Sequence, residues 1–329
     1  MWTGTEMIVW GGLRVPGEPD LGDGARYDPA RDAWTPTSAV GAPSARAEYD
    51  AFWTGTQMII WGGTHRTGGL YDPGTDTWTA MPASTAPFER FADAAVWTGT
   101  EMIVWGGCCD TAGADYVSGG HYDPATNMWG PMSQVGTPSG RSEAVAVWTG
   151  TEMIVWGGAA FGGSFLPLAD GGRYDPAADS WAAISATGAP DARCGASAVW
   201  TGTEMIVWGG LGTADIFNSG GRYDPLADVW APTSVVGAPG ARVWHAAVWT
   251  GALMIVAGGA GGGEPWLDGG RYDPAADSWT PTAALGAPPE RAFPTAVWTG
   301  AEMIVWGGLD YDVVTAMDVY PIEGGRYAP

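Results

Sequence analysis

Short apolar runs recur at nearly regular intervals along the whole chain, and turn residues separate them. The clearest example is VWTGTEMIVWGG at 147–158, where two apolar runs flank Thr-Gly-Thr and the second run ends in Gly-Gly. Runs of four to six residues that are rich in Val, Ile and Trp and bounded by turn residues predict β-strands. No stretch of ten residues or more has the apolar spacing of a helix. The chain is therefore expected to be all-β.

Each repeat contains four such runs, which we label strands a to d from the innermost to the outermost. AAVW is followed by TGT, EMIVWGG, a variable insert, GGRYDP and ADSWTP. Thr-Gly predicts a tight hairpin and Asp-Pro a type I turn. MIVW is apolar on both faces, as expected of a strand covered on each side. The first tryptophan of each copy stands at Trp2, Trp53, Trp97, Trp148, Trp200, Trp249 and Trp298.

The order and period of these motifs resemble those of the Kelch repeat. The spacing between copies is about 50 residues, within the range of propeller blades. Gly-Gly occurs at 11–12, 62–63, 106–107, 157–158, 209–210, 258–259 and 307–308, Tyr-Asp at 27–28, 71–72, 122–123, 174–175, 223–224 and 272–273, and the later Trp at 34, 78, 129, 181, 230 and 279. The resemblance implies a seven-bladed β-propeller with four-stranded antiparallel blades, of the bacterial, galactose-oxidase-like kind. One domain would span 1–329, with blades near 1–41, 42–86, 87–137, 138–189, 190–238, 239–287 and 288–329.

The first and last blades are expected to be incomplete. The first repeat lacks strand a, and the last stops at Pro329 without strand d. Met1 stands where five other copies have Val, and a GTG codon can be read either as Val or as a Met start. We therefore expect a misplaced start, with an upstream segment that supplies both strands. The alternative is a six-bladed ring with additional N-terminal residues, and it would leave two apolar hairpin strands outside the ring.

Composition limits the classes of partner. All 14 basic residues are Arg, and 36 acidic residues leave a formal charge of −22. Such a chain repels nucleic acid and anionic membrane surfaces. No apolar run approaches the ~18 residues needed to span a bilayer. We expect no nucleic-acid partner, no membrane insertion and a monomer.

The cellular location is an expectation from resemblance and composition only. The absence of Lys suggests a GC-rich bacterial genome, and acidic, Trp-rich Kelch proteins favour an extracellular or periplasmic location. The sequence shows no signal peptide at its start, so a correct start would leave the protein cytoplasmic. Three cysteines, at 108, 109 and 194, are too few for a disulfide framework. Two free thiols are preferred over a vicinal Cys108–Cys109 disulfide.

Arginines occur at two fixed places in the repeat, which indicates a structural role. We expect their guanidinium groups to bridge blades by bonding to backbone carbonyls or to carboxylates such as Glu6, Glu101, Glu152, Glu204 and Glu302. An anion-binding ring at the channel entrance is the alternative for the first set. That first set, before strand a, is Arg46, Arg90, Arg141, Arg193, Arg242 and Arg291, and the second, in GGRY, is Arg26, Arg173, Arg222, Arg271 and Arg326.

Candidate binding residues fall on the face formed by the b–c and d–a connections, which vary between repeats. Loops on a rigid scaffold usually carry binding. The aromatic loop candidates are Phe161, Phe165, Trp266 and Tyr311, and the candidates around strand a are Trp244, His245, Glu48, Asp93 and Glu143. The aromatic loop residues would contact a partner or pack on each other over the channel mouth. The carboxylates, with Asp50, would converge there as solvated lining, as Ca²⁺ ligands or as an acid–base pair.

No catalytic set is recognisable, and no cofactor is expected. Galactose oxidases of the Kelch type bind copper through two His and two Tyr, and the three histidines at 65, 121 and 245 do not form such a set. His121 replaces the Arg of GGRY, which indicates a structural substitution. Cys194 and His245 begin neighbouring inner strands and offer a weak alternative as a transition-metal site.

The preferred function is a non-catalytic scaffold that binds a protein or a glycan. The alternatives are an enzyme at the channel mouth, either galactose-oxidase-like or cyclase-like, and a structural module of a larger surface protein.

Overall fold

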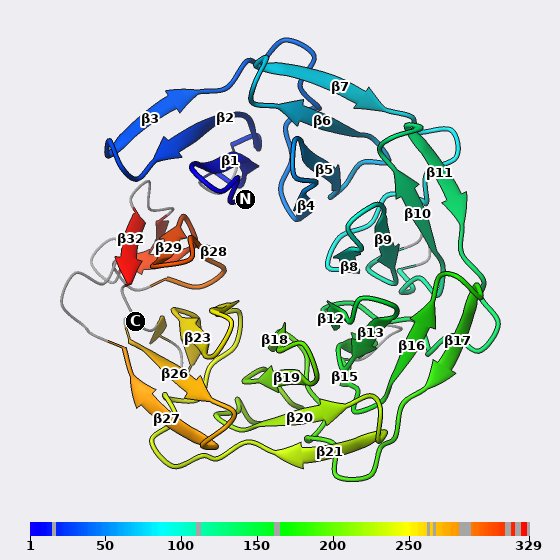
Figure 1. Ribbon diagram of the computed structural model, residues 1–329, viewed down its shortest axis with the longest axis vertical. Helices are drawn as coiled ribbons and strands as arrows, with labels where there is room; N and C mark the ends of the chain where they lie inside the picture. Colours follow the sequence, from blue (N-terminus) through cyan, green and yellow to red (C-terminus); the bar gives the residue numbers. More distant parts are fainter. Residues whose placement is uncertain are drawn as a thin grey trace.

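The computed structural model is a closed ring of seven radially arranged β-sheets around a central channel (Figure 1). It describes residues 1–14, 18–109, 113–160, 165–261, 264–265, 268–282, 291–312, 317–319 and 324–327. No helix occurs among these residues, and none could therefore span a membrane. The prediction of a seven-bladed all-β propeller is confirmed.

Five blades have four antiparallel strands, in the order a, b, c, d from the channel outward. Blade 2 is β4 (Tyr49–Trp53), β5 (Met58–Gly62), β6 (Gly68–Asp72) and β7 (Thr77–Met81). Blade 3 is β8 (Ala94–Trp97), β9 (Met102–Trp105), β10 (Gly119–Asp123) and β11 (Met128–Pro131). Blade 4 is β12 (Val145–Trp148), β13 (Met153–Trp156), β16 (Gly171–Asp175) and β17 (Ser180–Ala183).

Blade 5 is β18 (Ser197–Trp200), β19 (Met205–Trp208), β20 (Gly220–Asp224) and β21 (Val229–Pro232). Blade 6 is β22 (Ala246–Trp249), β23 (Met254–Ala257), β26 (Gly269–Asp273) and β27 (Ser278–Pro281). Three two-stranded hairpins lie in the b–c connections: β14 (Ala159–Ala160) with β15 (Leu166–Pro167), β24 (Ala260–Gly261) with β25 (Glu264–Pro265), and β30 (Asp310–Asp312) with β31 (Met317–Val319).

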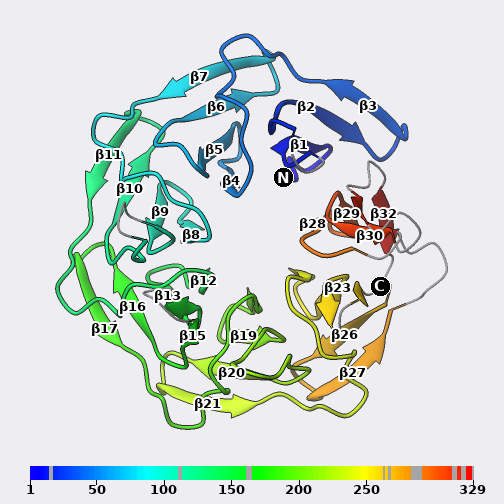
Figure 2. The ribbon, with the colours of Figure 1, turned by 180° about the vertical axis from the view of Figure 1, so that it is seen from behind.

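The first and last blades have three strands each in the described part of the chain, as predicted. Blade 1 is β1 (Met7–Gly12), β2 (Leu21–Asp28) and β3 (Ala33–Pro36), and blade 7 is β28 (Thr295–Trp298), β29 (Met303–Trp306) and β32 (Gly324–Tyr327). These two blades lie side by side where the ring closes, as seen from both sides in Figures 1 and 2.

Local hydrogen bonds explain why the two invariant turns repeat. In blade 4, Trp148 pairs with Met153, and the Thr149 amide donates to the Glu152 carbonyl at 3.0 Å, so Thr-Gly lies in a four-residue turn. In the following turn, Asp175 Oδ1 accepts the amides of Ala177 and Ala178 at 2.9 and 3.2 Å. These side-chain bonds hold the c–d turn in the Asp-Pro geometry.

A tryptophan pair lies in the core between most neighbouring blades. Strand b is buried on both faces, and Met153, Ile154, Val155 and Trp156 are fully inaccessible. The indole of each strand b packs against that of strand d in the next blade, with ring centroids 4.4–5.5 Å apart. The pairs are Trp10–Trp78, Trp61–Trp129, Trp105–Trp181, Trp156–Trp230, Trp208–Trp279 and Trp306–Trp34. The sixth blade has Ala257 at this position.

The first arginine set links each blade to the one before it. Arg141 is buried, and its Nη1 donates to the carbonyls of Gly157 and Asp170, at 3.1 and 3.0 Å, in its own blade. Its own carbonyl accepts the amide of Gly107, from blade 3, at 2.8 Å. The same carbonyl contact recurs at Arg46, Arg193, Arg242 and Arg291. The guanidinium bonds described for this set stay within one blade, so the predicted link between blades runs through the arginine backbone carbonyl and not through the guanidinium. Because the guanidiniums are directed at carbonyls inside the fold, they do not form an open anion-binding ring.

The second arginine set reaches across to the c–d turn of the next blade. Arg26, Arg173 and Arg222 donate to the carbonyls of Pro73, Pro225 and Pro274 at 2.7–2.8 Å. Their contacts with the glutamates of the a–b turn are longer, with Arg26–Glu6 at 3.7 Å and Arg173–Glu152 at 3.8 Å. His121 takes the same place in blade 3, where its Nε2 lies 2.7 Å from Tyr174 Oη in blade 4.

Candidate binding site at the channel mouth

The residue two positions after each buried arginine lies at the mouth of the channel, just before strand a. All six have a positive φ of 53–60°, which only glycine adopts without strain. We call these residues the mouth ring: Glu48, Ala92, Glu143, Gly195, Trp244 and Phe293. Backbone bonds tie parts of the ring together, because the amides of Glu143, Trp244 and Phe293 donate to the carbonyls of Ala92, Gly195 and Trp244 at 2.7–3.0 Å.

Aromatic and acidic side chains meet within this ring. Trp244 and Phe293 stack with their ring centroids 4.6 Å apart and an interplanar angle of 22°. Trp244 Nε1 points to Glu143 Oε2 at 3.4 Å, across the ring from blade 6 to blade 4. Phe293 is 54% exposed, so the stack is open to solvent on one side. The structure thus brings together Trp244 and Glu143, two residues that the sequence proposed separately.

Crowding of negative charge marks the same region. Burial raises the pKa of Glu48, and the carboxylates of Asp20 and Glu143 raise it further. Burial and the neighbouring Glu143 also raise the pKa of the Cys194 thiol well above its usual range. A positively charged group at this place would relieve the repulsion among these carboxylates.

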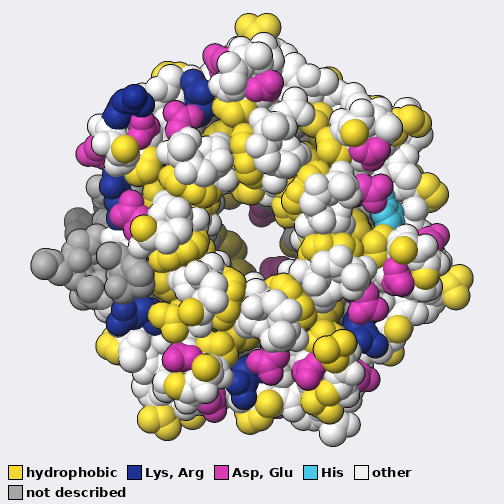
Figure 3. Space-filling model, in the orientation of Figure 1, with side chains coloured by type: hydrophobic (Ala, Val, Ile, Leu, Met, Phe, Trp, Pro, Cys, Tyr) yellow, Lys and Arg dark blue, Asp and Glu magenta, His cyan; other side chains and the backbone are white. Residues whose placement is uncertain are grey.

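A pair of carboxyl groups lies next to the ring, on neighbouring inner strands. Asp50 in β4 and Asp93 before β8 hydrogen-bond to each other. Burial raises the pKa of both, and each Oδ2 is buried without a further partner. Acidic side chains are visible inside the open channel in Figure 3. The predicted convergence of strand-a carboxylates therefore occurs here as a buried pair in which the pKa of each group is raised by burial.

His245 is placed differently from the mouth position that the sequence suggested. It is 8% exposed, packs edge-on against Trp208 at 5.2 Å, and its Nε2 lies 2.7 Å from Ser197 Oγ. Burial and the charge of Arg242 lower its pKa to about 3. A general base needs a pKa near the working pH and a group that stabilises its charged form. His245 Nδ1 has no partner among the described residues, so no group of the kind a general base needs lies there. The bond between His245 and Ser197 therefore serves to link blades 6 and 5.

The other site candidates lie elsewhere or outside the described part of the chain. Phe161 and Trp266 are outside the described residues, as is the side chain of Tyr311. Phe165 is 38% exposed and lies just before β15. Cys194 lies beside Glu143, whereas His245 Nε2 lies 2.7 Å from Ser197 Oγ.

Cys108 and Cys109 are joined in a vicinal disulfide. The sequence favoured two free thiols over this disulfide. Together with Asp115 they are the one group of three possible metal ligands within the described residues, with ligand atoms within 4.8 Å of one another. Because both sulfur atoms are engaged in the disulfide, this group is not a metal site in the form described.

Two residues of the site were missed by sequence reasoning. Phe293 reads as a core residue in RAFPTAVW, and Ser197 reads as a neutral position of strand a. The useful signal was the fixed spacing, because position 293 lies two residues after Arg291, as Trp244 lies two after Arg242.

A family model described as the KLHDC2/KLHL20/DRC7 Kelch-repeats domain matches residues 1–189 and, in a second overlapping match, residues 92–308. A search of the curated proteins finds no match.

Proposed function

The chain belongs to the Kelch-repeat family, and from this premise we propose that it is a non-catalytic scaffold that binds a partner protein through its channel mouth. Kelch propellers are commonly protein-interaction scaffolds. The single observation that supports the finer proposal is the open Trp244–Phe293 stack beside the Glu143 and Glu48 carboxylates.

This arrangement suits a cationic side chain of a partner. An arginine or lysine gains cation–π energy of roughly 0.5–2 kcal/mol on an aromatic face. A guanidinium also pairs with carboxylates through several hydrogen bonds. The acidic chain, with its charge of −22, adds long-range attraction for a basic partner. We therefore propose an exposed arginine-containing segment as the ligand, in preference to a neutral glycan.

The test is calorimetric titration with short peptides that carry a central Arg, Lys, Gln or Glu, and with neutral oligosaccharides. The arginine peptide is expected to bind at least tenfold more tightly than the glutamine peptide, and the difference should shrink as salt is added. The double variant Glu48→Gln/Glu143→Gln should lose most of this preference. Glu204→Gln, the same change on the a–b turn face, should keep it.

Two results would speak against the proposal. Equal binding of all four peptides would remove the role of the carboxylates. Binding of an oligosaccharide alone would move the function to glycan recognition, which is the other half of the scaffold hypothesis.

An enzyme at the channel mouth is the second candidate, and the Asp50–Asp93 pair is the observation that favours it. Two carboxyl groups that share a proton can act as an acid and a base. Hydrolysis of a panel of esters and glycosides, compared between the wild type and Asp93→Asn, tests this alternative. Turnover that is lost in the variant would establish it over the scaffold.

A further inference from the structure

Two cysteines and an aspartate meet in the b–c connection of blade 3. One possible ligand atom each of Cys108, Cys109 and Asp115 lies within 4.8 Å of the other two. Cys108 is buried, and the other two side chains are half-buried. The residues that directly follow Gly-Gly in the other repeats are Leu13, Thr64, Ala159, Leu211, Ala260 and Leu309. The cluster is therefore a feature of this repeat and not of the fold.

The backbone of Cys108 is held in the same way as in blades that have no cysteine there. Its amide donates to the Phe91 carbonyl at 2.9 Å, and the Phe91 amide donates to the Cys108 carbonyl at 3.1 Å. The same two bonds join Ala159 to Ser142 in blade 4, at 2.8 and 3.0 Å. Since blade 4 holds this position without a sulfur atom, we expect the backbone of Cys108 to stay in place when the chemistry of its sulfur changes.

The segment that carries the aspartate is tied to the same part of blade 3. The Tyr116 amide donates to the Gly107 carbonyl at 2.9 Å, and the Tyr116 hydroxyl donates to the Cys109 carbonyl at 3.3 Å. The buried guanidinium of Arg90 lies 4.5 Å from the centre of the Tyr116 ring and donates to the Gly106 carbonyl at 2.8 Å. The two ends of the connection are thus fixed against each other. This arrangement brings the three side chains together before any ion binds.

The chemistry of the three groups indicates which ion they suit. Thiolates favour Zn²⁺ and Cu⁺ over Mg²⁺ and Ca²⁺. Zn²⁺ is bound by Cys sulfur at about 2.3 Å and by Asp oxygen at about 2.0–2.2 Å, so two of its ligand atoms are at most about 4.6 Å apart. The spacing of the three atoms is close to this requirement. Three protein ligands would leave the fourth tetrahedral position to water.

We propose that reduction of the Cys108–Cys109 disulfide creates a Zn²⁺ site formed by Cys108, Cys109 and Asp115. Two molecules of a thiol reductant supply the two electrons and two protons that convert the S–S bond into two thiols, and they leave joined by a new disulfide. Zn²⁺ then replaces both thiol protons, which pass to solvent, and bonds to two thiolates and one carboxylate. The oxidised protein does not hold the ion, because the ligand is the thiolate.

Zinc binding by the full chain, in its oxidised and reduced forms, tests the proposal. A phosphine reduces the disulfide by taking up the oxygen of one water molecule, and it is then removed without air. A colorimetric thiol assay shows whether two new thiols have formed. The reduced protein should bind one Zn²⁺ per chain in competition with a chromogenic chelator, and the oxidised protein should bind none. Co²⁺ in place of Zn²⁺ should give a thiolate-to-cobalt charge-transfer band.

Two variants test the ligands. The double variant Cys108→Ser/Cys109→Ser should lose both the zinc and the charge-transfer band. Asp115→Asn should bind Zn²⁺ at least tenfold more weakly and should keep the band, because its two thiolates remain.

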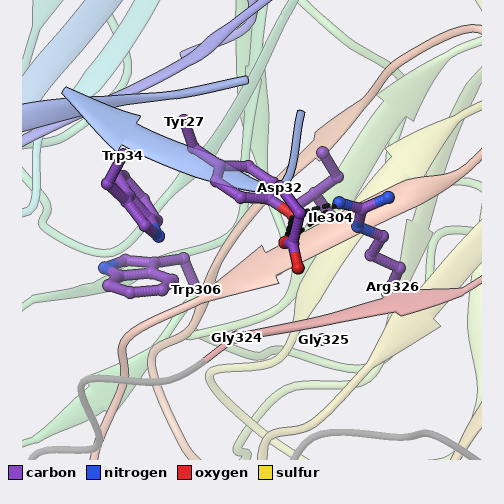
Figure 4. Close-up of a pocket in the computed structure, with 8 residues that line it drawn as sticks. All are labelled: Tyr27, Asp32, Trp34, Ile304, Trp306, Gly324, Gly325 and Arg326. Carbon is purple, nitrogen blue, oxygen red and sulfur yellow. Dashed lines mark hydrogen bonds and ion pairs between the residues drawn. The ribbon is translucent and has the colours of Figure 1, made fainter. Parts of the chain in front are cut away.

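Two control variants make the same chemical changes away from the cluster. Cys194→Ser alters the third cysteine, at the position where blade 4 has Ser142. Asp32→Asn alters a carboxylate that accepts the Tyr27 hydroxyl at 2.6 Å, in the pocket between blades 7 and 1 that Figure 4 shows. Asn127 holds the equivalent position in blade 3, so this variant should fold. Both controls should bind Zn²⁺ as tightly as the wild type, and thermal unfolding shows whether each variant is folded.

Four results would overturn the proposal. They are a reduced protein that binds no Zn²⁺, equal binding by the oxidised and reduced forms, a disulfide that the phosphine does not reduce in the folded chain, and an Asp115→Asn variant that binds as tightly as the wild type.

Discussion

The carboxyl group of Asp50 hydrogen-bonds that of Asp93 inside the ring. Two ionised carboxylates at such a contact repel each other, and burial together with the charge of Asp93 raises the pKa of Asp50. This makes the inner wall of blades 2 and 3 a place where proton binding and stability are linked.

Replacing Asp50 with Asn should stabilise the protein at neutral pH. Burial first, and then the charge of Asp93, raises the pKa of Asp50 above its value of about 3.9 in an unfolded chain. Its contribution to stability is thus complete below that value and is lost as the pH rises through the raised pKa. Asn needs no proton, so the variant should melt above the wild type at pH 7, with a smaller difference at pH 4. Circular dichroism melts from pH 4 to 8 check this, with Asp215→Asn as an exposed control; equal melting at pH 7 would contradict it.

Arg141→Lys should lower the stability of the fold although it keeps the positive charge. The guanidinium donates to Ser139, Gly157 and Asp170 at once, at 2.9–3.1 Å. One ammonium cannot reach all these acceptors, and buried carbonyls are left unpaired. We expect a loss of roughly 3 kcal/mol in the free energy of unfolding, measured by urea titration. Arg31→Lys, at a side chain that is 82% exposed, should change the free energy of unfolding by less than about 0.5 kcal/mol; similar losses for both would refute the structural role of the Arg141 guanidinium.

Two substitutions in the mouth ring should act in opposite directions. At Gly195 (φ 60°) a Cβ would lie 2.5 Å from Val243 Cγ2 and 2.9 Å from Trp244 Nε1, so Gly195→Ala should destabilise the fold by about 1–3 kcal/mol. It should also displace the Trp244 indole. Ala92 holds the same conformation with a side chain (φ 53°), and Ala92→Gly should stabilise by up to about 1 kcal/mol. Thermal melts and tryptophan emission of both variants test this; the same sign for both would exclude strain at these positions.

The stability lost on replacing a tryptophan of an interblade pair should increase with the burial of that tryptophan. Trp156 is fully buried, and Trp156→Ala should cost about 3–5 kcal/mol. Trp34 is 37% exposed, and Trp34→Ala should cost roughly 1–2 kcal/mol. Urea unfolding of both variants gives the comparison. Equal costs would mean that the boundary between blades 7 and 1 is as tightly packed as that between blades 4 and 5.

The architecture could be predicted from the sequence because the same turn and strand motifs recur along the chain. The Asp-Pro and Thr-Gly turns, the apolar MIVW strand and the fixed Trp positions recur at most copies, so even the incomplete first and last blades were expected. Local preference and overall fold support each other throughout.

The site could be predicted only in part. Glu48, Glu143 and Trp244 were placed near the mouth because they lie around the start of strand a, the innermost strand of each repeat. Which side chains meet there depends on ring geometry, since Glu143 and Trp244 are 101 residues apart in the chain. His245 was misjudged because neighbouring residues before strand a point alternately into the channel mouth and into the space between blades.

Amide hydrogen exchange with and without the arginine peptide tests the central claim most directly, namely that this propeller binds a cationic partner at its channel mouth. The account predicts new protection at residues 47–49, 142–144, 243–245 and 292–294, and none in the c–d turns on the opposite face. Protection confined to the c–d turns, or spread evenly over all blades, would contradict it.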